Sequence, residues 1–360
     1  MRIAIIVFES LSFSSLRDRL SDFDAIIDVR SPAEYADDHV DGAINCPVLD
    51  DEQRAQVGTI YRNASPFDAK KLGATLVARN IADHIERRFS RQPRSWRPLV
   101  YCWRGGERSG ALAHVLSRIG WRTVQLQGGY KGYRHTVLDE LTTLPANLDF
   151  RMLCGPTGSG KTRMLAALAT RGAQIIDLEG LALHRGSVLG VLPDETVQPS
   201  QRRFESLLWN ALCGLDARRP VYVESESRKI GDIHVPTVLI ERLRASACIV
   251  LEMDFEARVS SLLHDYAHLI AAPEALRTRL GYLTMLHGRQ RIAEWGELIS
   301  EARWRELVES LLAQHYDASY RRSTHENFGK IGAAQRVVLS AADVESFDAA
   351  AKSIIDDQAC

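Results

Sequence analysis

The sequence predicts an α/β protein of two domains, a parallel-sheet domain followed by a second α/β domain with a helical C-terminal part. Apolar strands alternate with helical stretches along the chain, which is typical of parallel sheets covered by helices. Two glycine-rich turns, at 102–109 and 155–162, each lie between an apolar strand and a helix. A chain of 360 residues is long enough to give each domain its own core.

The first domain is expected to span residues 1–141. Its first clear strand is 25–30, and Ser31-Pro32-Ala33-Glu34 then has the capping serine, first-turn proline and early acid of a helix start. A turn and a short strand follow at 40–45, and residues 50–89 are mostly helical. Strands are predicted at 98–101 and 123–126, with a helix over 110–119 between them.

The second domain is expected to span residues 148–360, because Thr142-Thr143-Leu144-Pro145 interrupts a helix in the boundary region 141–147. Strands are predicted at 151–154, 173–177, 221–224 and 247–253, with a helix over 162–169. From 255 to about 319 the pattern is helical, with apolar positions such as Leu276, Leu280, Leu283 and Leu286 at three- and four-residue spacing.

Composition excludes several classes of protein. The formal net charge of −1 gives no overall attraction to a polyanion, so a nucleic-acid surface must be a local patch. The apolar start is only one strand long, so we expect no signal peptide and no membrane association. The six cysteines include no C-x-x-C pair, which argues against structural zinc and favours a cytoplasmic location.

The turn at 102–109 carries a cysteine among glycines and arginines, Cys102-Trp103-Arg104-Gly105-Gly106-Glu107-Arg108-Ser109. Thiolate is the reactive form of cysteine, and it is favoured at a helix N-terminus and beside arginine. Glycines let successive backbone N–H groups converge on an anion. We therefore predict Cys102 as a nucleophile rather than a buried core cysteine. The predicted oxyanion loop is Arg104, Gly105, Gly106 and Arg108.

Residues 155–162 match the phosphate-binding P-loop pattern G-x-x-x-x-G-K-[ST], with a strand before it and a helix after it. Lys161 is expected to bridge diphosphate oxygens, and the Thr162 hydroxyl is a candidate ligand for Mg²⁺ that enters with the diphosphate. No tightly bound cofactor is expected. The predicted diphosphate-binding residues are Gly155, Gly158, Ser159, Gly160, Lys161 and Thr162.

Acidic residues follow two strands of the second domain, at Asp177, Glu224 and Glu226. Ligands of α/β folds gather at the carboxyl ends of strands, so these acids are candidates for metal binding or for contact with a substrate cation. The alternative is a solvated loop in which Arg228 and Lys229 pair with the two glutamates.

The first domain resembles the rhodanese family. The resemblance is carried by 28–35, 39–45, the Cys102 loop and Gly128-Gly129-Tyr130. It implies that Cys102 carries sulfur or selenium, and that Asp28, Arg30 and His39 are structural ties. The spacing from Cys102 to Arg108 is also the C-x-x-x-x-x-R of phosphatase relatives. A loop of this length suits a phosphate-bearing donor, such as selenophosphate.

The combination of this domain with the P-loop domain resembles the bacterial tRNA 2-selenouridine synthase family. The matching segments cover nearly the whole chain: 47–59 with Tyr61, 102–109, 177–182, 184–187, 224–231, and His315-Tyr316-Asp317 with Tyr320. The resemblance implies that geranyl diphosphate first alkylates the sulfur of a wobble 2-thiouridine in tRNA, and that selenophosphate selenium then replaces the geranylthio group. The implied partners are tRNA, geranyl diphosphate, selenophosphate and the synthetase that makes selenophosphate. Placing geranyl diphosphate, rather than ATP, at the P-loop is a hypothesis.

Candidate tRNA contacts are Arg88, Arg91 and Trp96, because basic residues with an interleaved aromatic can bind phosphates and stack a base. The alternative is a solvated charged face. The helical segment with Trp295, Trp304, Leu307 and Leu311 is expected to be core, or to shape an apolar channel for the prenyl chain. His315 on that segment is expected to be a hydrogen-bonded packing residue.

Three alternatives stay open. One is a rhodanese-type sulfurtransferase fused to an ATPase, which would hydrolyse ATP and transfer sulfur without tRNA. Another is a phosphatase-like loop, although Tyr101 stands where such enzymes have a histidine. The last is a non-catalytic scaffold. Such a protein has no physical need to keep Cys102, Lys161 and Thr162, so their presence argues against it.

Overall fold

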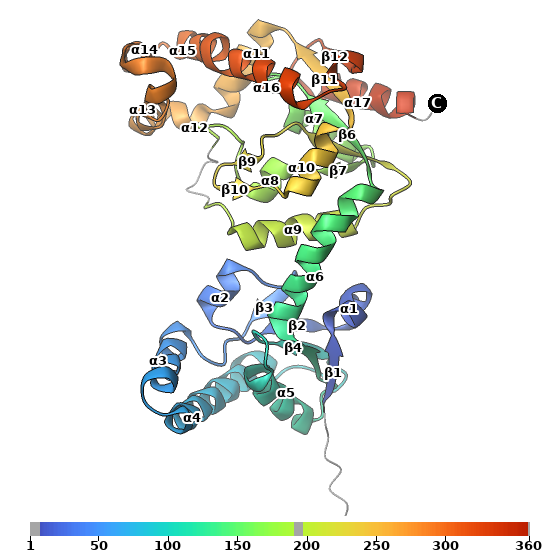
Figure 1. Ribbon diagram of the computed structural model, residues 1–360, viewed down its shortest axis with the longest axis vertical. Helices are drawn as coiled ribbons and strands as arrows, with labels where there is room; N and C mark the ends of the chain where they lie inside the picture. The colour runs from blue at the N-terminus through green and yellow to red at the C-terminus, as the bar shows by residue number, and fades with distance from the viewer. Residues whose placement is uncertain (1–7, 191–196, 359–360) are drawn as a thin grey trace, which may run out of the picture. The chain divides into compact units, whose positions relative to one another are not determined.

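The fold is described from a computed structural model, over residues 8–190 and 197–358 (Figure 1). The chain forms two compact units. The first is Met1–Glu140 with Glu205–Asn210, and the second is Leu141–Phe204 with Ala211–Cys360. Each unit is built on a five-stranded parallel sheet, as the strand–helix alternation of the sequence predicts.

The sheet of the first unit has the strand order β1-β5-β4-β2-β3. Its elements are β1 (Glu9–Ser12), α1 (Phe13–Leu16), η1 (Arg17–Asp22), β2 (Ala25–Asp28), α2 (Pro32–Asp37), β3 (Ala43–Asn45), α3 (Asp51–Asn63), α4 (Pro66–His84), η2 (Ile85–Phe89), β4 (Pro98–Tyr101), α5 (Glu107–Ile119), β5 (Val124–Gln127) and α6 (Gly129–Thr143).

Local signals set several of these boundaries. Ser31 and Glu34 form a capping box at the start of α2, and Asp50 and Gln53 form another at the start of α3. The central strand β4 is buried along its whole length and leads directly into the Cys102 turn. The edge strand β1 is not predicted by the sequence, because its short polar run carries no alternating apolar pattern.

The sheet of the second unit has the strand order β12-β11-β6-β8-β7, and a two-stranded antiparallel ribbon joins β9 and β10. The elements are η3 (Leu144–Asn147), β6 (Asp149–Cys154), α7 (Lys161–Thr170), β7 (Gln174–Ile176), α8 (Leu178–Ala182), α9 (Gln201–Cys213), β8 (Pro220–Glu224), β9 (Lys229–Ile230), β10 (Ile233–His234), α10 (Thr237–Arg244), β11 (Ala247–Met253), α11 (Phe255–Asp265), α12 (Ala267–Ile270), α13 (Pro273–Gly281), α14 (Thr284–Ser300), α15 (Trp304–Leu311), η4 (Leu312–Tyr316), α16 (Asp317–Asn327), η5 (Ile331–Ala333), β12 (Gln335–Leu339) and α17 (Val344–Gln358).

A separate apolar cluster holds the helices from α12 to α15 together. It includes the leucines at 276, 280 and 283, whose spacing predicts helix, and it is centred on Trp295, which is fully buried. This confirms the helical C-terminal part of the fold. Among the described residues, no helix is long and apolar enough to cross a membrane.

Candidate active sites

The Cys102 loop is held in place by main-chain hydrogen bonds from the start of α6. The carbonyl of Cys102 accepts from the Tyr130 N–H at 2.8 Å, and the carbonyl of Trp103 accepts from the Lys131 N–H at 2.9 Å. A Cβ atom on Gly129 would lie 2.3 Å from the Cys102 carbonyl oxygen, so only glycine permits this approach. Two main-chain hydrogen bonds therefore fix the start of the loop independently of its side chains.

The sulfur of Cys102 lies in a buried polar chain. The Ser109 hydroxyl is 3.3 Å from it, and the Gln125 side-chain amide donates to that hydroxyl at 2.8 Å. The Gly106 carbonyl is another acceptor for the Ser109 proton, but it already accepts from Gln125 at 3.0 Å and from the Gly110 N–H at 2.6 Å. The Cys102 sulfur is therefore the less occupied of the two acceptors within reach of the Ser109 hydroxyl.

The two loop arginines differ in their surroundings. Arg108 donates to Glu34 at 2.9 Å, and Arg54 pairs with the same carboxylate at 2.8 Å. Burial works to raise the pKa of Glu34, but the hydrogen bond and the charge of Arg108 outweigh it and lower that pKa. Arg104 is exposed and forms no ion pair within the described part of the chain. Of the two arginines in the predicted oxyanion loop, Arg108 is held by its ion pair with Glu34, whereas the Arg104 side chain is exposed to solvent.

Asp28 and Arg30 form a buried ion pair beneath this loop, at 2.6 Å. Arg30 also donates to the Asp38 carbonyl at 2.6 Å, and its guanidinium lies 4.0 Å from the centre of the Tyr130 ring. The Nδ1 atom of His39 lies 2.8 Å from the Tyr35 carbonyl oxygen, which accepts the hydrogen bond, and the two rings stack with 3.9 Å between their centres. These residues tie segments together, as the rhodanese resemblance implies.

The P-loop connects β6 to α7. Gly158 and Gly160 have positive φ angles of 82° and 80°, and a Cβ on Gly160 would lie 2.3 Å from the Phe347 ring. Lys161 donates across the loop to the Gly155 carbonyl at 2.9 Å. The Ser159 hydroxyl is buried and has no hydrogen-bond partner among the described residues. The predicted diphosphate residues therefore form one turn at the start of α7.

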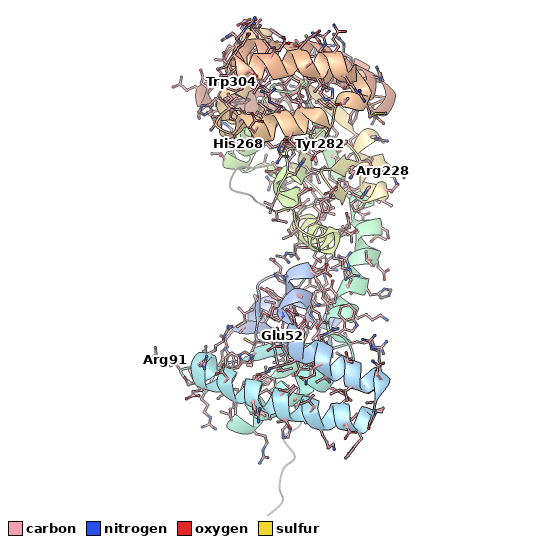
Figure 2. The ribbon with its side chains drawn as sticks, turned by 90° about the vertical axis from the view of Figure 1, so that its left-hand side faces the viewer. Glu52, Arg91, Arg228, His268, Tyr282 and Trp304 are labelled. Atoms are coloured by element: carbon pink, nitrogen blue, oxygen red, sulfur yellow. The ribbon has the colours of Figure 1, made fainter. Side chains whose placement is uncertain are left out.

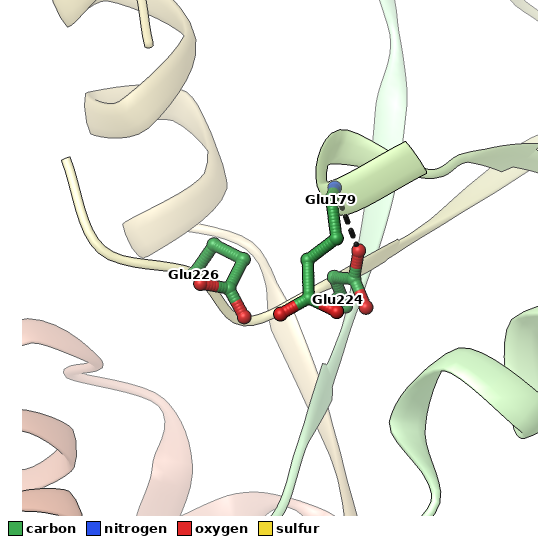
Figure 3. A group of neighbouring side chains, drawn as sticks. All are labelled: Glu179, Glu224 and Glu226. Atoms are coloured by element: carbon green, nitrogen blue, oxygen red, sulfur yellow. Dashed lines mark hydrogen bonds between the residues drawn. The ribbon is translucent and has the colours of Figure 1, made fainter. Parts of the chain in front are cut away.

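Three carboxylates converge beside this turn. Glu224 ends β8, Glu226 follows it, and Glu179 comes from the first turn of α8, with ligand oxygens within 4.8 Å of one another (Figure 3). The Thr162 hydroxyl is 3.2 Å from Glu224 and 3.3 Å from Glu179. Glu179 was not among the predicted acids. Asp177, which was, accepts from the Gly180 N–H at 2.7 Å as the cap of α8.

Crowding shifts the protonation of these acids. Burial, followed by the charge of a neighbouring glutamate, raises the pKa of Glu179 to about 8 and that of Glu226 to about 7. The same causes raise the pKa of Glu224 well above its usual range. Carboxylate and hydroxyl oxygens are the ligands that Mg²⁺ prefers, so Thr162 and the three glutamates fit this ion.

The alternative ion pairs with Arg228 and Lys229 are not found. Lys229 pairs with Asp232 at 3.4 Å, and Arg228 donates to the Thr237 hydroxyl at 3.0 Å. Lys229 thus pairs within the β9–β10 turn and Arg228 contacts the start of α10, so the alternative in which these cations pair with the two glutamates is not found among the described residues.

An apolar cavity of about 550 Å³, counted to its open mouth, adjoins the P-loop. Its walls come from α11, α12, α13, α15 and η4, with Trp304 labelled in Figure 2. Arg258 donates to the Thr157 carbonyl at 2.9 Å and holds Asp317 through both terminal nitrogens, which fixes the P-loop against the cavity wall. The lining residues are Thr157, Leu189, Leu262, Tyr266, Leu269, Ile270, Leu276, Trp304, Leu307, Val308, Leu311, Leu312 and Tyr316.

Comparisons with known proteins cover both units of the chain. A rhodanese-like domain model matches residues 12–136, and a model of the tRNA 2-selenouridine synthase AAA domain matches residues 148–282. The tRNA 2-selenouridine synthase of Alcanivorax borkumensis is 34% identical over 82% of this chain and 88% of its own length. The chain belongs to the tRNA 2-selenouridine synthase family.

Two further similarities were found. The tRNA 2-selenouridine synthase of Marinobacter nauticus is 33% identical over 85% of this chain and 90% of its own length. A solved rhodanese-related protein from Thermoplasma volcanium is 18% identical over 36% of this chain and 93% of its own, with a TM-score of 0.24. A TM-score this low adds nothing to the family assignment.

The candidate tRNA contacts of this family member divide into exposed and buried residues. Arg91 is exposed (Figure 2), and Arg88 is exposed although it donates to the Asn45 carbonyl at 3.0 Å. Trp96 is only 3% exposed and packs against Phe89 and Trp121, each at 5.1 Å between ring centres. The prediction that Trp96 stacks a base is wrong, because the ring is used in the core.

His315 is a hydrogen-bonded packing residue, as the sequence predicts. Its Nδ1 lies 3.0 Å from Nε2 of His287, and burial, followed by the nearby His287, lowers the pKa of His315. The next two residues contribute to the surroundings of the P-loop, since Tyr316 lines the apolar cavity and Asp317 accepts hydrogen bonds from Arg258.

Replacing Ser109 tests the hydrogen bond to the sulfur. Ser109→Ala should slow alkylation of Cys102 by iodoacetamide at neutral pH by about tenfold, because the attacking sulfur loses its hydrogen bond from the Ser109 hydroxyl. Ser109→Thr keeps the hydroxyl and should restore the rate. Ser117→Ala, a buried serine elsewhere on α5, is the control. Alkylation is followed by mass spectrometry, and an unchanged rate in Ser109→Ala would refute the directed hydrogen bond.

The acid cluster predicts a pH-dependent stability. In the folded chain Glu179 and Glu226 hold their protons up to about pH 8 and pH 7, whereas in the unfolded chain they release them near the ordinary glutamate pKa of 4.5. The free energy of unfolding should therefore fall as the pH rises from about 4.5 to about 8. Mg²⁺ should offset this loss most at the alkaline end. Glu226→Gln should weaken both effects in thermal unfolding, whereas the exposed Glu297→Gln should not. A Mg²⁺ effect that does not grow with pH would contradict the site.

Proposed function

We propose that this chain is a tRNA 2-selenouridine synthase that works in two steps. A geranyl group from geranyl diphosphate first alkylates the sulfur of wobble 2-thiouridine, and selenium from selenophosphate then replaces the geranylthio group. The observation that carries the proposal is an apolar cavity whose wall includes Thr157 of the P-loop. A diphosphate with a hydrocarbon chain fits this pair of neighbouring features.

The cavity favours a prenyl chain over a nucleotide base. Its lining is dominated by leucine, isoleucine, valine and aromatic side chains. A nucleotide base would bring several hydrogen-bonding groups that this wall could not satisfy, whereas burying hydrocarbon is favourable.

The first step would be an alkylation at sulfur. The sulfur of 2-thiouridine forms a bond to C1 of the geranyl group, the C1–O bond breaks, and diphosphate leaves with the electron pair while the base loses its N3 proton. The backbone N–H groups of the P-loop and Lys161 lie where they can stabilise the charge that builds on the diphosphate. Thr162, Glu179, Glu224 and Glu226 would hold Mg²⁺, which supplies further neutralisation of the diphosphate when bound.

The second step is assigned to the Cys102 loop. The Cys102 sulfur would form a bond to C2 of the base while geranylthiolate leaves with the C–S electron pair and takes up the thiol proton. Selenium of selenophosphate would then form a bond to C2, and the Cys102 sulfur would leave with its electron pair. The phosphorus–selenium bond of the donor breaks, and water supplies the fourth oxygen of the phosphate product. Exposed Arg104 and the glycine-rich turn offer partners for the phosphate of the donor, and Cys102 with its Ser109 hydrogen bond is the reactive group beside them.

Mass spectrometry of nucleosides from 2-thiouridine tRNA tests this function. Geranyl diphosphate alone should give the geranylated nucleoside, and adding selenophosphate should give 2-selenouridine. Lys161→Ala should lower geranylation by at least about 100-fold, because it removes a charge from the leaving diphosphate. Cys102→Ala should stop at the geranylated nucleoside, while Cys213→Ala, a cysteine outside both sites, should complete the reaction. Hydrolysis of ATP without any change in nucleosides would favour a sulfurtransferase–ATPase instead.

A further inference from the structure

Trp103 is an exposed aromatic residue that follows the reactive cysteine directly. It is 39% exposed, whereas Cys102 is 3% exposed. Neither the P-loop reaction nor the hydrogen bonds of the sulfur use this side chain. A large apolar side chain left open beside a reactive group is a candidate contact for a substrate.

The orientation of the Trp103 ring is set by a buried column beneath it. The Trp103 and Tyr130 rings lie 5.3 Å apart with a tilt of 30°. Tyr130 is itself buried, its hydroxyl donates to Asp38 at 2.9 Å, and the Arg30 guanidinium lies 4.0 Å from its ring centre. The indole is therefore supported by a column that cannot easily shift, and an already ordered ring loses little entropy when a ligand stacks on it.

We propose that Trp103 is the stacking platform for the uracil base that reacts at the Cys102 loop. This inference rests on the proposed function, since it names the part of the tRNA that this site holds. A base whose C2 is attacked must leave the stack of its neighbours, and proteins replace the lost stacking with aromatic side chains. Trp103 offers that surface one residue from the sulfur, and the neighbouring Arg104 is exposed and available for a phosphate.

The side chain can be replaced without removing the contacts that shape the loop. Those contacts run through main-chain atoms, namely the carbonyls of Cys102 and Trp103 and the N–H groups of Tyr130 and Lys131. Ser109 reaches the sulfur from α5 and does not contact the indole in the described structure. A loss of stacking can therefore be separated from a loss of the reactive thiolate.

The test measures kcat and KM for selenium incorporation into S-geranylated tRNA by Trp103→Leu and Trp103→Phe. Trp103→Leu keeps apolar bulk without an aromatic face, so KM for the tRNA should rise on the order of tenfold. Trp103→Phe should stay close to the wild type. Phe67→Leu, which removes an exposed aromatic side chain on α4, is the matched control and should leave KM unchanged. Iodoacetamide alkylation of Cys102 should proceed at the wild-type rate in all variants.

Each outcome supports or overturns the platform. An active Trp103→Leu enzyme with wild-type KM overturns it and leaves the proposed function standing. Slower alkylation of Cys102 in Trp103→Leu also overturns it, because the side chain would then act on the loop rather than on the base. A wild-type enzyme that transfers no selenium to tRNA overturns the proposed function and the platform together.

Discussion

Both sites depend on main-chain approaches so close that only glycine fits. A side chain on Gly129 would collide with the Cys102 carbonyl, and one on Gly160 would collide with the Phe347 ring. The first approach lets the start of α6 fix the cysteine loop through backbone hydrogen bonds. The second seats the P-loop against α17, an element far away in the sequence. The reactive groups are thus positioned by main-chain geometry, which leaves their side chains available for substrates.

The two sites differ in how far their charged side chains are paired with opposite charges. Around Cys102 most of the charged side chains already have partners, since Arg108 is paired with Glu34 and Arg30 with Asp28, while Arg104 is exposed. Beside the P-loop, the buried Glu224 and the half-buried Glu179 and Glu226 crowd together near Lys161 and Thr162. The raised pKa values of Glu179 and Glu226 reflect that imbalance. A cation that arrives with a diphosphate would relieve this crowding. A bound cation would therefore stabilise the P-loop site, whereas the hydrogen bonds of the cysteine loop are formed without a ligand.

Much of this arrangement could be predicted from local sequence patterns. The strands before Cys102 and Gly155 are apolar runs that end in glycine-rich turns, and Glu224 stands at a strand end. The features that the sequence does not predict depend on contacts between segments that are distant in the chain. Glu179 joins the cluster only because α8 folds back on β8, and Gln125 reaches Ser109 from a neighbouring strand. The sequence does not predict that Trp96 is buried, because its basic neighbours suggest a position on the surface. In the structure the ring packs against Phe89 and Trp121 and is buried.

The central claim is that one ligand fills both the P-loop and the apolar cavity. Calorimetric binding of geranyl diphosphate, inorganic diphosphate and ATP tests it most directly, with wild type and with Val308→Trp, which places a bulky ring in the cavity wall. Geranyl diphosphate should bind wild type at least about tenfold more tightly than inorganic diphosphate, because its chain adds apolar burial. Val308→Trp should abolish that advantage and leave inorganic diphosphate unaffected. Equal affinity of wild type for the two ligands, or tight ATP binding that Val308→Trp does not change, would contradict the claim.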